Sequence, residues 1–201
     1  MAVETHIYDR KFFRNTIKLE NSSAKAAVNI LIKHLKPKSV IDIGCGSGIY
    51  LKEFADQGTG IIGYDGSPAA IAESLVKDKT RIYDLCKPLH LDRKFDLCIC
   101  IEVAEHLPAK CAPILINTLT KLSSLIIFTA ATPGQGPRSI GHINEQLPEY
   151  WIKKFKAKNF QLDKKLTSKI KKEMKEKNVV WWIVKNLMVF KKSITKNIFY
   201  S

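Results

Sequence analysis

Short apolar runs alternate with longer amphipathic segments along most of the chain. Apolar runs between turn residues are typical of buried strands, while apolar side chains every three or four positions indicate helices. The predicted strands are 39–43, 60–64, 80–83, 95–101, 124–131, 159–163 and 179–190, the last with a bulge near 185–186. The predicted helices are 22–36, 49–56, 69–76, 108–122, 148–158 and 164–177. This alternation indicates an α/β fold with a mostly parallel sheet and helices on both faces.

The segment before the first predicted helix, at 6–20, mixes aromatic and charged residues and is expected to form an N-terminal arm or helix that closes over a ligand. Ser22 or Ser23 is expected to cap the helix that follows, since serine is a favoured N-cap. Two interpretations of Tyr8 and Asp9 stay open. They either reach a bound ligand or serve as a packing residue and a helix cap.

The chain has 201 residues, 45% of them hydrophobic, which is enough for one domain with a substantial core. No apolar run reaches the roughly 18 residues of a membrane-spanning helix, so no membrane span is predicted. All five cysteines are expected to be reduced, because none shows Cys-x-x-Cys spacing. A cytoplasmic location is therefore expected, in the host cytoplasm if the protein is viral.

The formal net charge is +14, and many of the lysines follow Lys153. Such a charge suggests a polyanionic partner, either nucleic acid, an anionic membrane or an acidic glycan. The alternative is a solvated lysine-rich surface with no partner. The segment 164–177 carries much of this charge and has an apolar residue at every fourth position, which predicts a basic amphipathic helix.

A glycine-rich turn follows the first predicted strand, with Gly44, Gly46 and Gly48 at alternate positions before an apolar helical pattern. Strand, glycine turn and helix N-terminus together let the backbone approach a ligand closely. Asp42 lies inside the otherwise apolar strand, and a buried carboxylate requires a partner such as an ammonium group. The nicotinamide fingerprint places its third glycine one position later, where this chain has Ile49.

The second predicted strand ends in Asp65-Gly66, about 20 residues after the first glycine. An acidic side chain at that point can accept hydrogen bonds from both hydroxyls of a ribose. The third strand leads into Asp84-Leu85. A surface turn is the alternative for both acidic residues.

The central strand at 95–101 is followed by Glu102-Val103-Ala104-Glu105-His106-Leu107-Pro108. A helical turn there brings Glu102, Glu105 and His106 onto one face, at the sheet edge where open α/β proteins bind ligands. Two carboxylates and an imidazole indicate a proton-transfer group with His106 as base, a divalent-metal half-site, or only a helix cap. The polar segment 132–146, which contains His142, is expected to face a substrate.

From the glycine turn onward the chain resembles class I S-adenosylmethionine-dependent methyltransferases. The resemblance implies a Rossmann-like, seven-stranded sheet whose last strand is antiparallel. It also implies that Asp84 binds the adenine amino group and that the Leu85 N–H binds the ring. In this interpretation 1–36 is an arm and helix, 37–131 the cofactor-binding half and 132–201 the substrate side. The expected cofactor-binding residues are Asp42, Gly44, Gly46, Gly48, Asp65, Gly66, Asp84, Leu85 and Glu102.

Two closer likenesses concern the acceptor. The stretches 36–42, 102–108, 133–136, 141–146 and 181–187 resemble a family of small bacterial and viral methyltransferases often encoded near glycan-modifying genes. The Glu-x-x-Glu-His pattern with a later histidine is similar to small-RNA 3′-terminal 2′-O-methyltransferases. That second likeness implies a divalent cation, Mn²⁺ or Mg²⁺, held by Glu102, Glu105, His106 and His142.

The expected function is methylation of a saccharide hydroxyl, with His106, Glu105 and His142 as catalytic residues. An RNA ribose 2′-hydroxyl is the second candidate acceptor. A non-catalytic polyanion-binding protein on the same fold is the third possibility. A small-molecule acceptor is compatible with the first interpretation, and neither the acceptor's identity nor the oligomeric state follows from the sequence.

Overall fold

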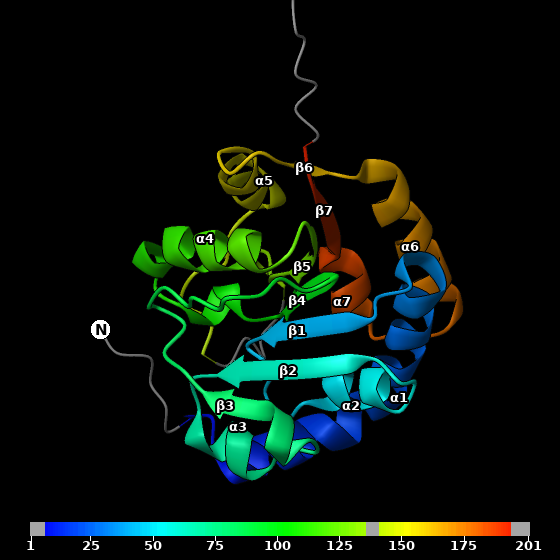
Figure 1. Cartoon of the computed structure of the whole chain (residues 1–201), viewed down its shortest axis with the longest axis vertical. Helices are drawn as coiled ribbons and strands as arrows, with labels where there is room; N and C mark the ends of the chain where they lie inside the picture. The colour runs from blue at the N-terminus through cyan, green and yellow to red at the C-terminus, as the bar shows by residue number, and fades with distance from the viewer. Residues whose placement is uncertain (1–6, 136–140, 194–201) are drawn as a thin grey trace, which may run out of the picture.

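The computed structural model describes residues 7–135 and 141–193. They form a seven-stranded sheet in the order β3-β2-β1-β4-β5-β7-β6 (Figure 1). Its strands are β1 (Ser39–Ile43), β2 (Gly60–Asp65), β3 (Thr80–Ile82), β4 (Leu97–Ile101), β5 (Leu125–Thr129), β6 (Phe160–Leu162) and β7 (Met188–Lys192). Only β7 runs antiparallel to its neighbours, β5 and β6. The predicted sheet is confirmed.

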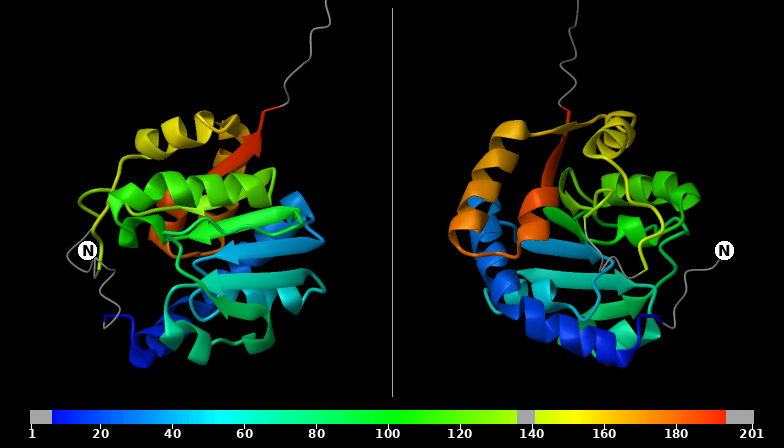
Figure 2. Two further views of the ribbon diagram at one scale, coloured as in Figure 1. Left: turned by 60° about the vertical axis from the view of Figure 1, so that its left-hand side comes forward. Right: turned by 180° about the vertical axis from the view of Figure 1, so that it is seen from behind.

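Helices cover both faces of this sheet (Figure 2). The α-helices are α1 (Arg10–Leu35), α2 (Ile49–Ala55), α3 (Pro68–Ala72), α4 (Ala112–Leu122), α5 (Pro148–Lys156), α6 (Lys164–Glu176) and α7 (Trp181–Asn186). Short 3₁₀ turns are η2 (Lys77–Lys79), η3 (Ala104–His106) and η4 (Ala109–Cys111). One core layer lies under α4 and α5, and a second lies under α1, α2, α6 and α7.

The central strand β4 shows why these segments are apolar throughout. Leu97 and Ile99 pack into the core layer of α1, whereas Cys98 and Cys100 pack into the layer of α4. Successive side chains of a strand point to opposite faces, so in a strand covered on both faces apolar residues are favoured at every position. Cys98 and Cys100 therefore lie on the same face of β4.

The N-terminal helix is longer than predicted. α1 begins at Arg10, and the Asp9 carboxylate caps it by accepting from the Phe12 N–H at 2.7 Å. The prediction that Ser22 or Ser23 starts this helix is wrong, because both lie in its interior. The Ser23 hydroxyl instead accepts the Val180 N–H at 3.1 Å, which ties α1 to the chain before α7.

The predicted strand 179–190 is a helix followed by a strand. Its first half forms α7, and only the part from Met188 pairs with β5. β-branched and aromatic residues favour strands, but tertiary packing overrides that preference here. The helical turn buries Ile183 and Asn186 while Trp181 stays 56% exposed. The predicted break near 185–186 marks the end of this helix.

The cysteine prediction is partly wrong, since Cys86 and Cys111 form a disulfide across 25 residues of sequence. Cys45, Cys98 and Cys100 are free and buried, as expected. Sequence spacing did not indicate the pair because the fold, not local chain geometry, brings the loop after β3 to η4. No helix among the described residues is long and apolar enough to cross a membrane.

The basic helix α6 is confirmed as amphipathic. Thr167, Ile170 and Met174 are buried on its inner face, and the helix packs against α1. Glu173 anchors that contact through Lys33 and His34, each 2.8 Å away. The apolar stripe is therefore core, and only the outer lysines remain for a partner.

Candidate active site

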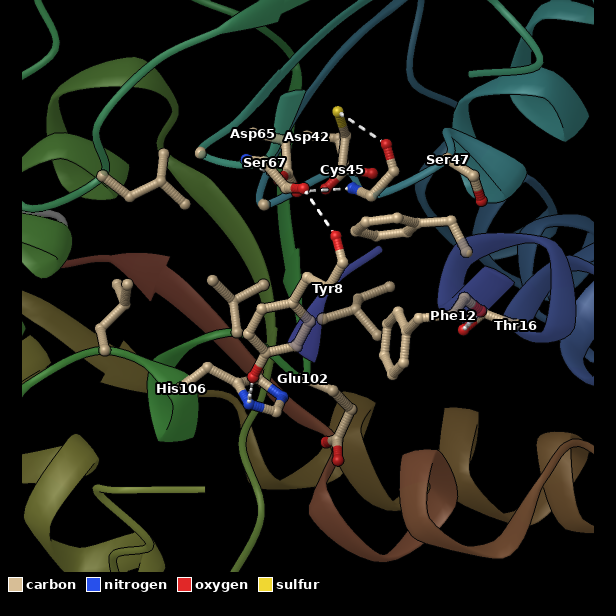
Figure 3. Close-up of a pocket in the computed structure, with 18 of the residues that line it drawn as sticks. Tyr8, Phe12, Thr16, Asp42, Cys45, Ser47, Asp65, Ser67, Glu102 and His106 are labelled. Atoms are coloured by element: carbon tan, nitrogen blue, oxygen red, sulfur yellow. Dashed lines mark hydrogen bonds between the residues drawn. The ribbon is translucent and has the colours of Figure 1, made fainter. Parts of the chain in front are cut away.

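A cavity of about 1190 Å³ opens at the carboxyl ends of the parallel strands. The turn after β1, the end of β2, the segment after β4, α1 and α7 all contribute to its wall (Figure 3). Of the predicted cofactor residues only Gly48 does not line it; Gly48 is the N-cap of α2. His106 and His142 line the cavity, whereas Glu105 is fully buried behind them.

The glycine turn is fastened to the end of β2. The Tyr64 carbonyl accepts from the N–H groups of Gly44 (2.7 Å) and Cys45 (3.1 Å). The Asp65 carboxylate accepts from the N–H of Gly46 and from that of Ser67, both at 2.8 Å. Asp65 thus orders the two backbone segments that border the cavity, in addition to facing it.

Gly44 is required for a steric reason. Its φ is +84°, and a Cβ atom there would overlap both methyl groups of Val103. Gly58 has nearly the same φ, +79°, but nothing lies within 4 Å of its Cβ position. Gly58 therefore offers a matched control that isolates backbone strain from overlap.

Gly44→Ala is expected to lower the free energy of unfolding by about 3 kcal/mol, against about 1 kcal/mol for Gly58→Ala. Both variants place an alanine at positive φ, which is unfavourable, but only Gly44→Ala also adds a clash with Val103. Urea denaturation monitored by circular dichroism measures both values. Equal losses would show that Val103 moves aside without cost.

Asp42 is 2% exposed, and its carboxyl makes no hydrogen bond to any described residue. Burial, and secondarily the charge of Asp65, raise the pKa of the Asp42 carboxyl well above its ordinary value. Glu20, Asp42, Asp65, Asp84 and Glu102 all line the cavity, and Lys110 is the one lysine or arginine among its described lining residues. This acidic wall inside a strongly basic chain suits a cationic ligand.

Asp84 and Leu85 lie at the rim of the cavity. The Asp84 carboxylate is exposed, accepts the Cys86 N–H at 2.9 Å and lies 3.7 Å from the Lys87 ammonium. Leu85 is buried, 8% exposed. Their predicted contact with adenine stays a prediction.

Glu102 and Glu105 do not share one helical face. Glu102 has φ +52°, outside the short turn η3 that contains Glu105 and His106. Its Oε1 accepts from the Asn186 amide of α7 at 3.1 Å. Glu105 Oε1 accepts the Ala131 N–H at 3.0 Å. Burial first, and then the neighbouring Glu102, raise the pKa of the Glu105 carboxyl well above its ordinary value.

The structure brings together three of the four predicted metal ligands. One ligand atom from each of Glu105, His106 and His142 lies within 4.8 Å of the others, and Glu102 is outside this group. The imidazole rings of His106 and His142 are 4.7 Å apart. His142 Nδ1 is 2.7 Å from the Glu145 carboxylate, which orients the ring as carboxylates orient metal-binding histidines.

His106 is held at one ring nitrogen. Its Nδ1 lies 2.7 Å from the Tyr8 hydroxyl and 3.3 Å from the Gly141 carbonyl. Burial, and secondarily His142, lower its pKa to about 4, so the imidazole is neutral at neutral pH. Its Nε2 makes no hydrogen bond to a described residue, which leaves that nitrogen for a ligand.

Several cavity residues were not identified from the sequence. Glu20, Trp181 and Trp182 come from helices that were predicted as an arm or as a strand, so no pattern pointed to them. Tyr8 was left open between a ligand contact and packing.

The Glu20 carboxyl has a pKa raised to about 7 by burial and secondarily by Glu102. Between pH 4.5 and 7 the native state keeps this proton while the unfolded chain loses it, so stability falls as pH rises. The stability of the unliganded wild type relative to Glu20→Gln is expected to fall by about 2 kcal/mol from pH 4.5 to pH 8. Urea denaturation across that range measures the difference. A difference independent of pH would mean that Glu20 is ionised throughout.

The chain matches the family described as "Methyltransferase domain" over residues 18–163. It is 32% identical over 105 residues to the ubiquinone biosynthesis O-methyltransferase of Paraburkholderia phytofirmans, covering 48% of this chain and 45% of that protein. The corresponding protein of Stutzerimonas stutzeri is 31% identical over 113 residues, covering 51% and 49%. The chain thus spans about half the length of the curated relatives it matches.

Solved structures show the same fold. A methyltransferase from Archaeoglobus fulgidus superposes with a TM-score of 0.63 at 18% identity, covering 90% of this chain and 99% of that one. Magnesium protoporphyrin IX methyltransferase from Synechocystis, solved with S-adenosylhomocysteine, gives 0.59 at 21% identity, covering 72% and 74%.

The cavity fits S-adenosylmethionine. Its volume suffices for a nucleoside cofactor, and its carboxyl groups complement a sulfonium and an ammonium group. The unpartnered carboxyl of Asp42 is the kind of group that a cationic ligand would satisfy. With the family match over most of its length, the chain belongs to the methyltransferase domain family and is an S-adenosylmethionine-dependent methyltransferase.

Proposed function

We propose that this enzyme is an O-methyltransferase that acts on a saccharide hydroxyl. The observation that carries the proposal is the cluster of His106, His142 and buried Glu105 at the cofactor cavity. A hydroxyl is a poor nucleophile until its proton is removed, so a neutral imidazole beside the acceptor suits O-methylation. The curated relatives are themselves named O-methyltransferases, which supports oxygen as the acceptor atom.

The saccharide acceptor rests on the glycan-associated sequence resemblance and on the lining of the cavity. Phe12, Trp181 and Trp182 add aromatic surface to the wall of the same cavity. Aromatic faces together with a few polar groups are typical of sites that orient a small ligand. A sugar diol presents both an apolar face and paired hydroxyls to such a wall.

The residues of the chain have separate tasks in this proposal. When bound, S-adenosylmethionine supplies a methyl group already activated on a sulfonium. Asp65 holds the glycine turn and faces the ribose, and the acidic wall compensates positive charge. His106 Nε2 accepts the hydroxyl proton as the O–CH₃ bond forms and the S–CH₃ bond breaks. The proton then lies on His106, whose low pKa returns it readily to solvent.

The same cluster would alternatively hold a divalent cation. Glu105, His106 and His142 offer one carboxylate and two imidazoles, a donor set that suits Mn²⁺ better than Mg²⁺. An ion there would lower the pKa of a bound hydroxyl and orient a vicinal diol. A cation there would also compensate the charge of the buried Glu105 carboxylate, which fits this alternative.

An RNA ribose is the second candidate acceptor. The net charge of +14 and the exposed lysines of α6 favour it, because phosphate contacts depend on such charge. Because the chain is a methyltransferase, we do not propose the non-catalytic polyanion-binding function.

The test is methyl transfer from radiolabelled S-adenosylmethionine to a panel of acceptors, each with and without Mn²⁺. The panel contains methyl glycosides with a free vicinal diol, their deoxy analogues, short RNA with a 3′-terminal diol and a catechol. Incorporation into the glycosides, lost with the deoxy analogues, is expected. Incorporation into RNA or catechol alone would overturn the saccharide proposal while leaving O-methylation standing.

A further inference from the structure

Tyr8 spans the distance between the cofactor side and the acceptor side of the cavity (Figure 3). Its backbone carbonyl accepts from the Ser67 hydroxyl at 3.2 Å, next to the Asp65 turn. Its phenol oxygen lies 2.7 Å from His106 Nδ1, and its ring meets the imidazole edge-on at 5.5 Å between centroids. Asp9, the following residue, is the N-cap of α1, so Tyr8 directly precedes a fixed helix end. Tyr8 is thus held at its backbone carbonyl and at its phenol oxygen.

Gly141 makes room for this phenol. Its φ is +75°, and a Cβ atom there would overlap the Tyr8 hydroxyl. The Gly141 carbonyl lies 3.3 Å from the same His106 Nδ1. A segment far from Tyr8 in sequence therefore supplies both the space for the hydroxyl and a second contact to the imidazole.

The contacts at Nδ1 select one tautomer of His106. A carbonyl oxygen can only accept a hydrogen bond, so the Gly141 contact at 3.3 Å favours a proton on Nδ1. The phenol oxygen can then accept from the same N–H, sharing it with the carbonyl. The other nitrogen, Nε2, is left with its lone pair free.

We propose that Tyr8 is a positioning residue for His106: its phenol oxygen and the Gly141 carbonyl together hold Nδ1–H, so that an unprotonated Nε2 meets the acceptor or its metal ion. The proposal rests on the proposed function of His106. It explains why the His106 imidazole carries its proton on Nδ1. Burial, and secondarily Glu105 and Asp65, raise the pKa of Tyr8 to about 12, which keeps the phenol neutral.

The first test is ¹⁵N NMR of the histidine side chains, which distinguishes an Nδ1–H from an Nε2–H imidazole and needs no acceptor. Comparison with His106→Gln assigns the His106 signals. The wild type with S-adenosylhomocysteine is expected to show His106 as the Nδ1–H tautomer. Tyr8→Phe keeps the ring but removes the oxygen, and is expected to show a mixture of tautomers. An Nε2–H tautomer in the wild type, or an unchanged tautomer in Tyr8→Phe, would overturn the proposal.

The second test separates positioning from cofactor binding. Tyr8→Phe is expected to lower kcat about tenfold while the affinity for S-adenosylhomocysteine changes less than twofold. Tyr150→Phe removes a phenol oxygen from α5, outside the cavity, and is expected to leave both values unchanged. Equal losses in affinity and kcat would instead make Tyr8 a cofactor contact. Absence of turnover with every acceptor counts against the proposed function alone, since the tautomer measurement still decides the role of Tyr8.

Discussion

His106→Ala is expected to lower kcat by about 10²–10⁴-fold while the affinity for S-adenosylhomocysteine changes less than about threefold. The imidazole is neutral, contacts the described residues by hydrogen bonds at Nδ1 alone, and lies in the cofactor cavity beside His142. Its loss therefore removes a proton acceptor or a metal ligand without disturbing the Asp65 turn. Initial rates on the best acceptor of the panel and calorimetry with S-adenosylhomocysteine give the two values.

His90→Ala is the matched control, because His90 is exposed and does not line the cavity. Removal of metal by a chelator separates the two roles of His106. Wild-type activity that a chelator abolishes and Mn²⁺ restores indicates a ligand, and activity insensitive to the chelator indicates a base. Full activity of His106→Ala would refute both roles.

Asp65→Ala is expected to weaken binding of S-adenosylhomocysteine by about 10³-fold. The variant leaves the Gly46 and Ser67 amides without their acceptor and removes the carboxylate that we propose accepts from the ribose hydroxyls. Two charge-assisted hydrogen bonds at about 1.5–3 kcal/mol each account for a loss of this size. Calorimetric titration of the purified variant measures it.

Asp96 offers a matched control for the loss of an amide-binding carboxylate. It accepts the N–H groups of Lys38 and Ser39, both at 2.9 Å, at the start of β1, and it does not line the cavity. Asp96→Ala is expected to lower stability but to bind S-adenosylhomocysteine like the wild type. If Asp96→Ala weakened binding as much as Asp65→Ala, the effect of Asp65 would be a general loss of fold.

The cofactor side of the site could be predicted because its signals are local. Gly44, Gly46 and the acidic Asp65 stand at fixed distances from apolar runs, and each run became the predicted strand. Backbone conformation at a glycine, and the place where a strand ends, are decided within a few residues. Periodicity and spacing capture such features directly.

The acceptor side depends on contacts between distant segments. Tyr8 meets His106 across 98 residues of sequence, and Asn186 meets Glu102 across 84. Neither pairing leaves a periodic pattern. Glu102 was placed with Glu105 because an α-helical turn was assumed, but a left-handed residue precedes a 3₁₀ turn there. The disulfide between Cys86 and Cys111 escaped prediction for the same reason.

The bond between Ser23 and Val180 joins residues 157 positions apart, and α1 packs against α6. The first helix thus has no complete partner until α6 and the segment around Val180 have left the ribosome. Contacts of such long sequence range form late and slow folding. Because Tyr8 and Trp181 both line one cavity, a nascent chain that lacks α7 cannot complete its wall. Methyl transfer therefore becomes possible only after synthesis of the domain is essentially finished.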